Sequence, residues 1–247
     1  MDGIARAPSR VLMLDYDGTL APFHVRPDLA VPYPEAATVL EAILAAGGTR
    51  VVIVSGRPAD ELPPLLRLTK RPEIWGSHGW ERLLPDGRRM LEEPGPAARE
   101  SLHAAAAATE AMMPPAARLE RKLASIALHW RGLPQEVSSA LADDARALWE
   151  QRAGDLEILP FDEGLELRAP GCNKQFAVKA VLSETAQGAA VAYLGDDITD
   201  EDAFRAVKSR GLGVLVRAEF RQTEADVWLT PPQELVAFME HWCVQGG

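Results

Sequence analysis

The chain has little of what disulfide-bonded and membrane-spanning proteins depend on. Only two of its 247 residues are cysteine, Cys172 and Cys243, so no disulfide framework can hold the fold together. We find no apolar stretch long enough to span a bilayer, and the N-terminus lacks the apolar segment of a signal peptide. We therefore expect a cytoplasmic protein that has no membrane partner.

Clustered positive charge is also missing. The formal net charge is -10, with 26 Lys and Arg residues against 36 Asp and Glu residues. No basic stripe of the kind that contacts a nucleic-acid backbone is present, which argues against a nucleic-acid partner. A small phosphate ester stays compatible with this charge, because a cation and a few local donors can reverse the field inside one pocket.

What the chain does have is an alternation of strand and helix patterns at both ends. Strands separated by helices imply right-handed crossovers and a parallel sheet. In the first part, the predicted strands are 11–15, 51–54 and 74–76, the predicted helices 34–46 and 59–68, and a hairpin pattern covers 81–91. In the last part, the predicted helices are 174–184, 200–209 and 232–242, and the predicted strands 191–194, 213–216 and 227–229.

The middle of the chain has a different pattern. It predicts a helix at 97–113, two strands, a helix at 135–152 and two more strands. Such a segment forms a small α+β layer, most simply an inserted cap. We therefore predict an α/β protein in which residues 1–93 and 170–247 form a parallel-sheet core and residues 94–169 form an inserted α+β cap domain.

Two carboxylates follow the first buried strand. Asp15 and Asp17 come directly after the apolar run Val11–Leu14 and before Gly18. Residues i and i+2 of an extended backbone project to the same side, so both can address one reacting centre. Crowded carboxylates repel unless a hard cation such as Mg²⁺ joins them. The pair suits an aspartyl nucleophile with a second aspartate as proton donor, the chemistry of phosphoryl transfer. The same pattern also occurs in turns and in unrelated metal sites.

Three further segments fit this chemistry. Ser55 and Gly56 end the second strand, where a hydroxyl and backbone N–H groups can donate to a phosphoryl oxygen. Lys174 begins a helix and can place a charge between nucleophile and phosphate. Asp196 ends the fourth strand and adds a carboxylate for the cation.

Each of these segments has a structural alternative. A Ser-Gly pair after a strand often just turns the chain, and a lysine at a helix start is often solvated. An acidic helix N-terminus would explain Asp200 and its neighbours, but not why Asp196 and Asp197 directly follow an apolar strand. Asp197 and Asp200 could also orient the cation or its waters. Arg57 either adds positive charge near the phosphate or pairs with a nearby acid, and we favour the pairing.

These four polar segments, in the order in which they occur along the chain, resemble those of the haloacid-dehalogenase-type phosphatases. Within that group, the closer resemblance is to the trehalose-6-phosphate phosphatases. The strings that carry the resemblance are LDYDGTLAP, VSGR, GSHGWE, ERK followed by LHWR, ELR, NK-x-x-AV and GDDITDEDAF. The resemblance implies a Rossmann-like core with a cap, and Mg²⁺-dependent hydrolysis of trehalose 6-phosphate through an aspartyl-phosphate. The expected catalytic residues are Asp15, Asp17 and Lys174, the phosphate-binding residues Ser55, Gly56 and Lys174, and the metal ligands Asp15, Asp17 through its carbonyl, and Asp196.

By the same similarity, residues of the inserted layer would read the sugar. Glu120 and Lys122 lie two apart on one predicted strand and share a face, as do His129 and Arg131 on the next. The resemblance assigns sugar contacts to Glu120, Lys122 and Glu166, with weaker support for His78, Glu81 and Arg131. The alternative is that charged residues alternating along an exposed strand simply face solvent.

The chain departs from the family pattern at two positions, Gln175 where Gly is frequent and Trp130 where Tyr is frequent. Either change could alter which sugar is preferred. Competing interpretations are a phosphatase for sucrose phosphate or a glycosyl phosphoglycerate, a phosphomutase, and a regulatory module that binds a sugar phosphate without hydrolysing it. A trehalose-phosphate synthase is the functional partner that the resemblance suggests, and the sequence does not identify one.

Overall fold

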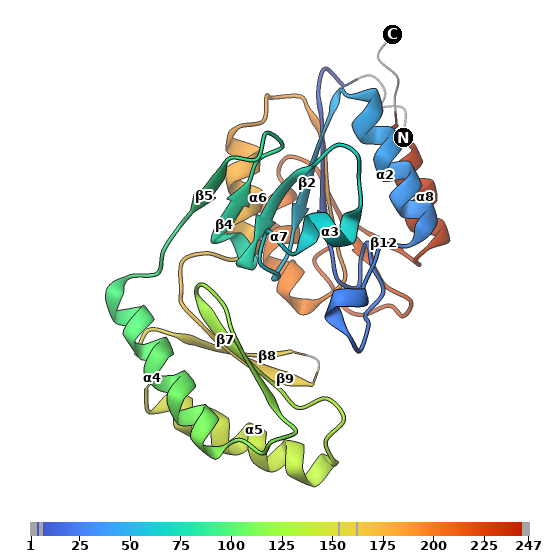
Figure 1. Cartoon of the computed structure of the whole chain (residues 1–247). Helices are drawn as coiled ribbons and strands as arrows, with labels where there is room; N and C mark the ends of the chain where they lie inside the picture. Colours follow the sequence, from blue (N-terminus) through green and yellow to red (C-terminus); the bar gives the residue numbers. More distant parts are fainter. Residues whose placement is uncertain (1–3, 5–6, 153, 162, 244–247) are drawn as a thin grey trace. The chain divides into compact units, whose positions relative to one another are not determined.

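The computed structural model describes residues 4, 7–152, 154–161 and 163–243 (Figure 1). The prediction that the N-terminus lacks a signal peptide concerns first residues that lie largely outside this description. The chain divides into two compact units. One contains the described residues up to Leu91 and from Cys172 onward, and the other is Glu92–Gly171. In the part of the chain that is described, no helix has the length and apolar character needed to cross a membrane.

The first unit is built on one eight-stranded sheet with the strand order β12-β11-β10-β1-β2-β3-β4-β5. The six strands from β12 to β3 are parallel, and β4 and β5 add an antiparallel hairpin at one edge. The strands are β1 (Arg10–Asp15), β2 (Thr49–Val54), β3 (Glu73–Gly76), β4 (Glu81–Leu83), β5 (Arg89–Leu91), β10 (Ala190–Gly195), β11 (Leu212–Val216) and β12 (Val227–Leu229).

Helices cover both faces of this sheet (Figure 1). One face packs on α2 (Pro34–Ala46) and α8 (Gln233–Glu240), the other on α6 (Lys174–Ser183) and α7 (Glu201–Val207). Because side chains alternate along β1, Leu12 and Leu14 join the first apolar layer while Val11 and Met13 join the second. A strand buried on both faces reads as one apolar run, which is why the sequence pattern identified it.

The predicted fold class is confirmed, with shorter elements in two places. The helix expected at 59–68 is reduced to α3 (Leu62–Leu66), because prolines occupy its first turn and Arg67 ends it in a left-handed conformation with φ 53°. The helix expected from 200 begins as a 3-10 turn, η3 (Ile198–Asp200), before α7.

The order of the strands reverses beside β1. After β1 the chain adds β2 and β3 on one side, and it later returns to place β10, β11 and β12 on the other side. In open parallel sheets, ligands bind beyond the carboxyl ends of the strands at such a switch point. Asp15 ends β1 and Gly195 ends β10, so the acidic residues that follow both strands meet there.

The second unit has a four-stranded antiparallel sheet in the order β6-β7-β9-β8, with two helices on one face (Figure 1). Its apolar face, which includes Ile126 and Leu167, packs on the two helices. The elements are α4 (Pro96–Met112), β6 (Arg118–Arg121), β7 (Ser125–His129), α5 (Gln135–Glu150), β8 (Glu157–Phe161) and β9 (Gly164–Arg168).

A buried hydrogen bond joins the two helices of this unit. The indole Nε1 of Trp149 on α5 donates to Oγ1 of Thr109 on α4 at 2.8 Å, and both side chains are fully buried. The same hydroxyl donates to the Ala105 carbonyl at 2.8 Å. Tryptophan can be buried here because its one polar atom has an acceptor.

We expect Thr109→Val to destabilise this unit by about 1–3 kcal/mol, because the indole N–H would lose its acceptor inside the protein. Amide hydrogen exchange in α4 and α5, measured against exchange in the core helices, checks this. Thr109→Ser keeps the hydroxyl and is the matched control. Equal protection in the Val and Ser variants would contradict the account.

Candidate active site

A buried lysine bridges two aspartates where β1 and α6 meet. Nζ of Lys174 lies 2.8 Å from Oδ1 of Asp15 and 2.7 Å from Oδ1 of Asp200. The three side chains are at most 5% exposed. Lys174 is fixed there because it opens α6, whose N-cap Asn173 accepts a hydrogen bond from the backbone N–H of Phe176 at 2.9 Å.

Asp200 holds the loop that follows β10. Its Oδ2 accepts hydrogen bonds from the backbone N–H groups of Asp196 and Asp197, at 3.1 and 3.0 Å. Its Oδ1 also accepts the phenolic hydrogen of Tyr193 at 2.6 Å. Asp197 and Asp200 together form a capping box around η3. Both oxygens of Asp200 are therefore occupied within the protein, which gives this residue an orienting role.

Asp196 lies against the backbone of the β1 loop. A Cβ built on Gly18 would lie 2.1 Å from Oδ2 of Asp196, and Gly18 has φ +85°, so glycine is required there for both space and conformation. Oδ1 of Asp196 is buried and has no hydrogen-bond partner among the described residues. Such an orphaned oxygen indicates a missing partner, since buried polar atoms are almost always satisfied.

The carboxylates of Asp15, Asp196 and Asp200 form a group that could hold a metal ion, with one ligand oxygen from each within 4.8 Å of the others. Burial raises the pKa of Asp15 to about 7, against the lowering effect of Lys174. Burial, with the charges of Asp15 and Asp200, raises the pKa of Asp196 to about 10. The single ammonium of Lys174 is thus insufficient to neutralise the three carboxylates. Their oxygen atoms are the ligands that a hard divalent cation prefers.

Two arginines from the segment after β11 fix the carbonyls of the acidic loop. Nη2 of Arg221 donates to the Asp197 carbonyl at 2.7 Å, and its Nε donates to the Asp196 carbonyl at 3.3 Å. Nη1 of Arg217 donates to that same Asp196 carbonyl at 3.4 Å. Arg221 also pairs with the Glu201 carboxylate at the start of α7. The loop is therefore held through its N–H groups by Asp200 and through its carbonyls by the arginines.

Asp17 points to a different partner from Asp15. Its two carboxylate oxygens accept hydrogen bonds from Nε and Nη2 of Arg57, both at 2.6 Å. The guanidinium also donates to the Pro27 carbonyl at 2.9 Å and lies 5.6 Å from the centre of the Tyr16 ring. Arg57 is thus in the pairing role that the sequence analysis favoured. The Asp17 side chain is 29% exposed, far more than that of Asp15.

The residues after β2 lie beside those after β3. Ser55 is buried, its Oγ accepts the backbone N–H of Arg57 at 3.1 Å, and its carbonyl accepts the N–H of His78 at 2.9 Å. The His78 ring lies against Gly56, where an added Cβ would be 2.6 Å from the ring. Glu81 is buried and accepts the Ser77 hydroxyl and the Ala59 N–H, so its carboxylate fixes this loop.

The expected sugar-reading residues of the second unit lie on one face of its sheet. Glu120 is paired with Ala127 and Ala127 with Glu166, so the two glutamates share a row across three strands. Glu166 is 6% exposed, accepts the Ser125 hydroxyl at 2.7 Å, and lies 3.5 Å from Nζ of Lys122.

Two of the other candidates in this unit have acidic or imidazole partners. Glu120 pairs with Nε2 of His129 at 2.9 Å, a contact that lowers the pKa of Glu120 to about 2. Arg131 pairs with Glu163 at 2.6 Å near the β8–β9 turn. The structure thus brings Glu120, Lys122 and Glu166 together on one sheet and leaves Arg131 paired at its margin.

Comparison with known proteins decides the family. A family model described as trehalose-phosphatase matches residues 13–228. The chain belongs to the trehalose-phosphatase family. A trehalose-phosphate phosphatase of Mycobacterium marinum is 33% identical over 225 residues, which cover 87% of this chain and 56% of that protein. The chain thus spans little more than half the length of this mycobacterial relative.

Solved structures agree on the fold of this trehalose-phosphatase family member. The C-terminal domain of C. albicans trehalose-6-phosphate phosphatase has a TM-score of 0.83 at 19% identity, covering 98% of this chain and 94% of that one. A haloacid dehalogenase-like hydrolase from Bacteroides thetaiotaomicron has a TM-score of 0.68 at 18% identity, with 94% and 98% covered. The expected haloacid-dehalogenase-type fold is thereby confirmed.

Sequence reasoning missed several residues that shape the site. Tyr193 sits inside an apolar strand, where an aromatic residue is expected for packing alone, and Arg217 and Arg221 follow a strand to which we assigned no role. The sequence analysis noted Gly18 only as the residue after the carboxylate pair, although its lack of a Cβ also makes room for Asp196. A glycine directly after two functional carboxylates was the one available signal.

We expect Asp196→Asn to raise the midpoint of thermal unfolding in EDTA by several degrees at pH 8, about 2–4 °C for each kcal/mol of stabilisation. The raised pKa of Asp196 means that the folded protein binds this proton more tightly than the unfolded chain does. Folding therefore loses stability as pH rises from about 4 toward 10, and removing the carboxyl removes that loss. Calorimetric scans at pH 5 and pH 8 check the prediction.

The matched control is Asp202→Asn, which removes an exposed carboxylate from the same region. It should move the midpoint little at either pH. A destabilised Asp196→Asn at pH 8, or a gain no larger than at pH 5, would show that the crowded carboxylates are not the source of the penalty.

Proposed function

We propose that this protein is a Mg²⁺-dependent phosphatase that hydrolyses trehalose 6-phosphate to trehalose and phosphate through an aspartyl-phosphate on Asp15. The observation that carries the proposal is the buried set of Asp15, Lys174 and Asp196 at the switch point of a trehalose-phosphatase-family core. A mycobacterial relative bears the same activity in its name. A cytoplasmic location and a synthase partner stay predictions from the sequence.

In the first step, Asp15 attacks phosphorus in line. A bond forms between its carboxylate oxygen and phosphorus, and the bond to the sugar oxygen breaks. Lys174 favours the ionised carboxylate and aims it, because its ammonium is already 2.8 Å from Oδ1. The hydroxyl of Ser55 has its oxygen lone pair engaged by the Arg57 N–H, which leaves its hydrogen to donate to a phosphoryl oxygen together with the Gly56 N–H.

Asp17 supplies and then removes the proton. It protonates the leaving sugar oxygen in the first step and deprotonates the water that cleaves the acyl-phosphate in the second. Both carboxylate oxygens of Asp17 are held by the Arg57 guanidinium, so the general acid role requires this pair to loosen and free an oxygen when substrate is present. Arg57 would then have its guanidinium available for the phosphate dianion.

The donor set fits a magnesium ion. We assign its ligands to Asp15, to the orphaned carboxylate oxygen of Asp196 and to the backbone carbonyl of Asp17, while Asp200 orients Lys174 and the loop. When bound, Mg²⁺ neutralises charge on the phosphate so that an anionic nucleophile can approach it. The carbonyls fixed by Arg217 and Arg221 keep Asp196 in position for this role.

The second unit is proposed as the cap that reads the sugar. Glu120 and Glu166 offer carboxylate acceptors on one sheet face, and Lys122 offers a donor 3.5 Å from Glu166. Sugar hydroxyls need such mixed acceptors and donors held at fixed spacing, and burial of Glu166 makes its hydrogen bonds worth more than those of an exposed carboxylate.

We expect Mg²⁺-dependent phosphate release from trehalose 6-phosphate in preference to sucrose 6-phosphate, glucose 6-phosphate and a glycosyl phosphoglycerate. Phosphate release with Mg²⁺ and with EDTA measures this, and Asp15→Asn should abolish it because the nucleophile is lost. Asp202→Asn is the control. Preference for another ester would keep the catalytic assignment and reject the sugar. Release from none of them, by a folded protein that binds Mg²⁺, would favour a regulatory module.

A substitution of Glu166 tests the proposed sugar-reading role of the second unit. Glu166→Gln should lower kcat/KM for trehalose 6-phosphate about tenfold, since a hydrogen bond to a charged group contributes about 1.5–3 kcal/mol. Release from a small ester such as p-nitrophenyl phosphate should change little, because the reacting groups lie in the core. Glu150→Gln, exposed at the end of α5, is the control. Equal losses on both esters would reject a sugar-reading role.

A further inference from the structure

A small cavity in the second unit is surrounded by basic side chains, in a chain whose net charge is -10. It lies between the first turns of α4 and the hairpin of β6 and β7, and its volume is about 90 Å³. The basic residues around it are Arg99, His103, Arg121 and Lys122. Positively charged side chains that approach one cavity from both α4 and the hairpin repel one another, and an anion bound between them would relieve this repulsion.

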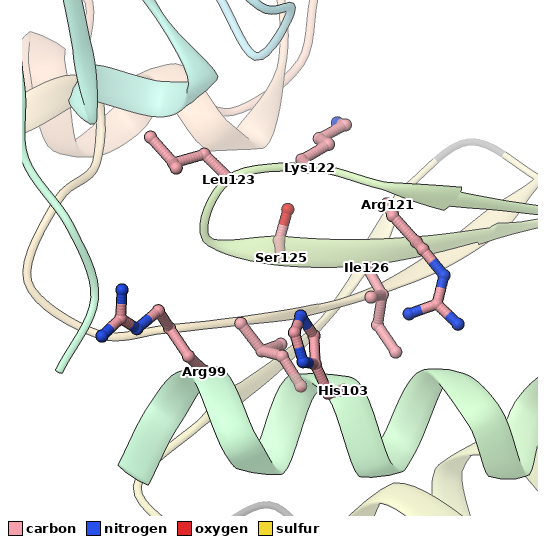
Figure 2. A pocket seen from close by; sticks show the side chains of 8 residues that line it. Arg99, His103, Arg121, Lys122, Leu123, Ser125 and Ile126 are labelled. Atoms are coloured by element: carbon pink, nitrogen blue, oxygen red, sulfur yellow. The ribbon is translucent and has the colours of Figure 1, made fainter. Parts of the chain in front are cut away.

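Figure 2 shows how these side chains lie. Arg121 extends from the hairpin toward α4, while Arg99 and His103 rise from α4 toward the hairpin. Lys122 points away from α4, which agrees with its contact to Glu166 on the other face of the sheet. The groups available to a ligand in the cavity are therefore those of Arg99, His103 and Arg121.

The existing partners of these groups leave donors for a ligand. Arg121 uses Nε and Nη2 for the Glu110 carboxylate, at 3.2 and 2.9 Å, and Arg99 uses Nη1 for Glu93 at 2.7 Å. Nη1 of Arg121 has no acceptor among the described residues, and His103 has neither a hydrogen bond nor an ion pair in that part of the chain. All four paired side chains are 46% or more exposed, so these pairs are weak and exchange readily.

Two further features favour a negative ligand of small size. The cavity adjoins the N-terminal part of a 17-residue helix that has no acidic residue in its first turn and no side-chain cap, so the helix dipole there is uncompensated. A volume of about 90 Å³ suits a tetrahedral oxyanion and is too small for a disaccharide or a nucleotide. The floor includes the buried side chains of Leu102 and Ile126, which a hydrated metal cation would not prefer.

We propose that this cavity is a second anion site, which binds inorganic phosphate or the phosphate group of a small monoester through Arg99, His103 and Arg121. It is separate from the phosphate site assigned to the core and does not rest on the proposed hydrolysis. The ring of His103 provides a local reporter, because it lines the cavity itself.

The test is a phosphate titration of the full chain in EDTA, followed through the ring resonances of His103 by NMR. We expect a saturable shift. Arg121→Gln should raise the dissociation constant about tenfold, the effect of losing one charge-assisted hydrogen bond. Glu110→Gln should lower the constant, since it frees the same guanidinium. Glycerol 3-phosphate, titrated in parallel, distinguishes a monoester ligand from the free ion by which of the two binds more tightly.

Arg146→Gln, exposed on α5, is the matched control because it removes the same charge away from the cavity. It should leave the dissociation constant unchanged. The proposal is overturned if phosphate gives no saturable shift of His103. It is also overturned if Arg146→Gln weakens binding as much as Arg121→Gln does, because the attraction would then be a property of net charge alone.

Discussion

The ammonium of Lys174, buried between Asp15 and Asp200, is the interaction on which the core of this protein depends. A buried carboxylate without a cation is costly, and two of them side by side are costlier still. Because Lys174 supplies that charge, the carboxylate of Asp200 can be buried beside Asp15 and accept the N–H groups of the acidic loop. The position of Asp196 then follows from that loop, and so does the burial of its Oδ1, which lacks a hydrogen-bond partner among the described residues.

The site is therefore organised in two layers of charge. The inner layer is the carboxylate group with its single lysine, which is short of positive charge. The outer layer holds the backbone through Arg217 and Arg221 on one side and pairs Asp17 with Arg57 on the other. A deficit of positive charge at the centre makes the site ready for a cation, and it also makes the centre a source of instability.

The sequence was sufficient to predict the core and most of its site, for reasons that can be stated residue by residue. β1 is buried on both faces and reads as one apolar run, and strands with helices between them end at one edge, so Asp15 and Asp196 had to meet. The Arg57–Asp17 pair is different, since an arginine after a turn has several acids within reach. The orienting role of Asp200 was also open, because acids at a helix N-terminus are common.

In the second unit, the alternation of side chains along a strand predicts only part of the arrangement of the site residues. Alternation placed Glu120 and Lys122 on one face, but only the register of β7 and β9 places Glu166 in the row of Glu120. Register depends on turn geometry and side-chain packing along several strands, which no single segment encodes. The cavity by α4 was invisible for a related reason, since its basic residues come from segments that carry no shared motif.

The central place of β1 has a consequence for how the chain is made. Arg10 pairs with Ala190, so one edge of β1 stays open until β10 has been synthesised, long after β2 has closed the other edge. The unit formed by Glu92–Gly171 is complete before that, and its contacts are local enough to form while the ribosome is still adding β10. Until then the nascent chain presents an apolar strand edge that can pair with other chains, so this interval is the one in which the chain is most exposed to aggregation.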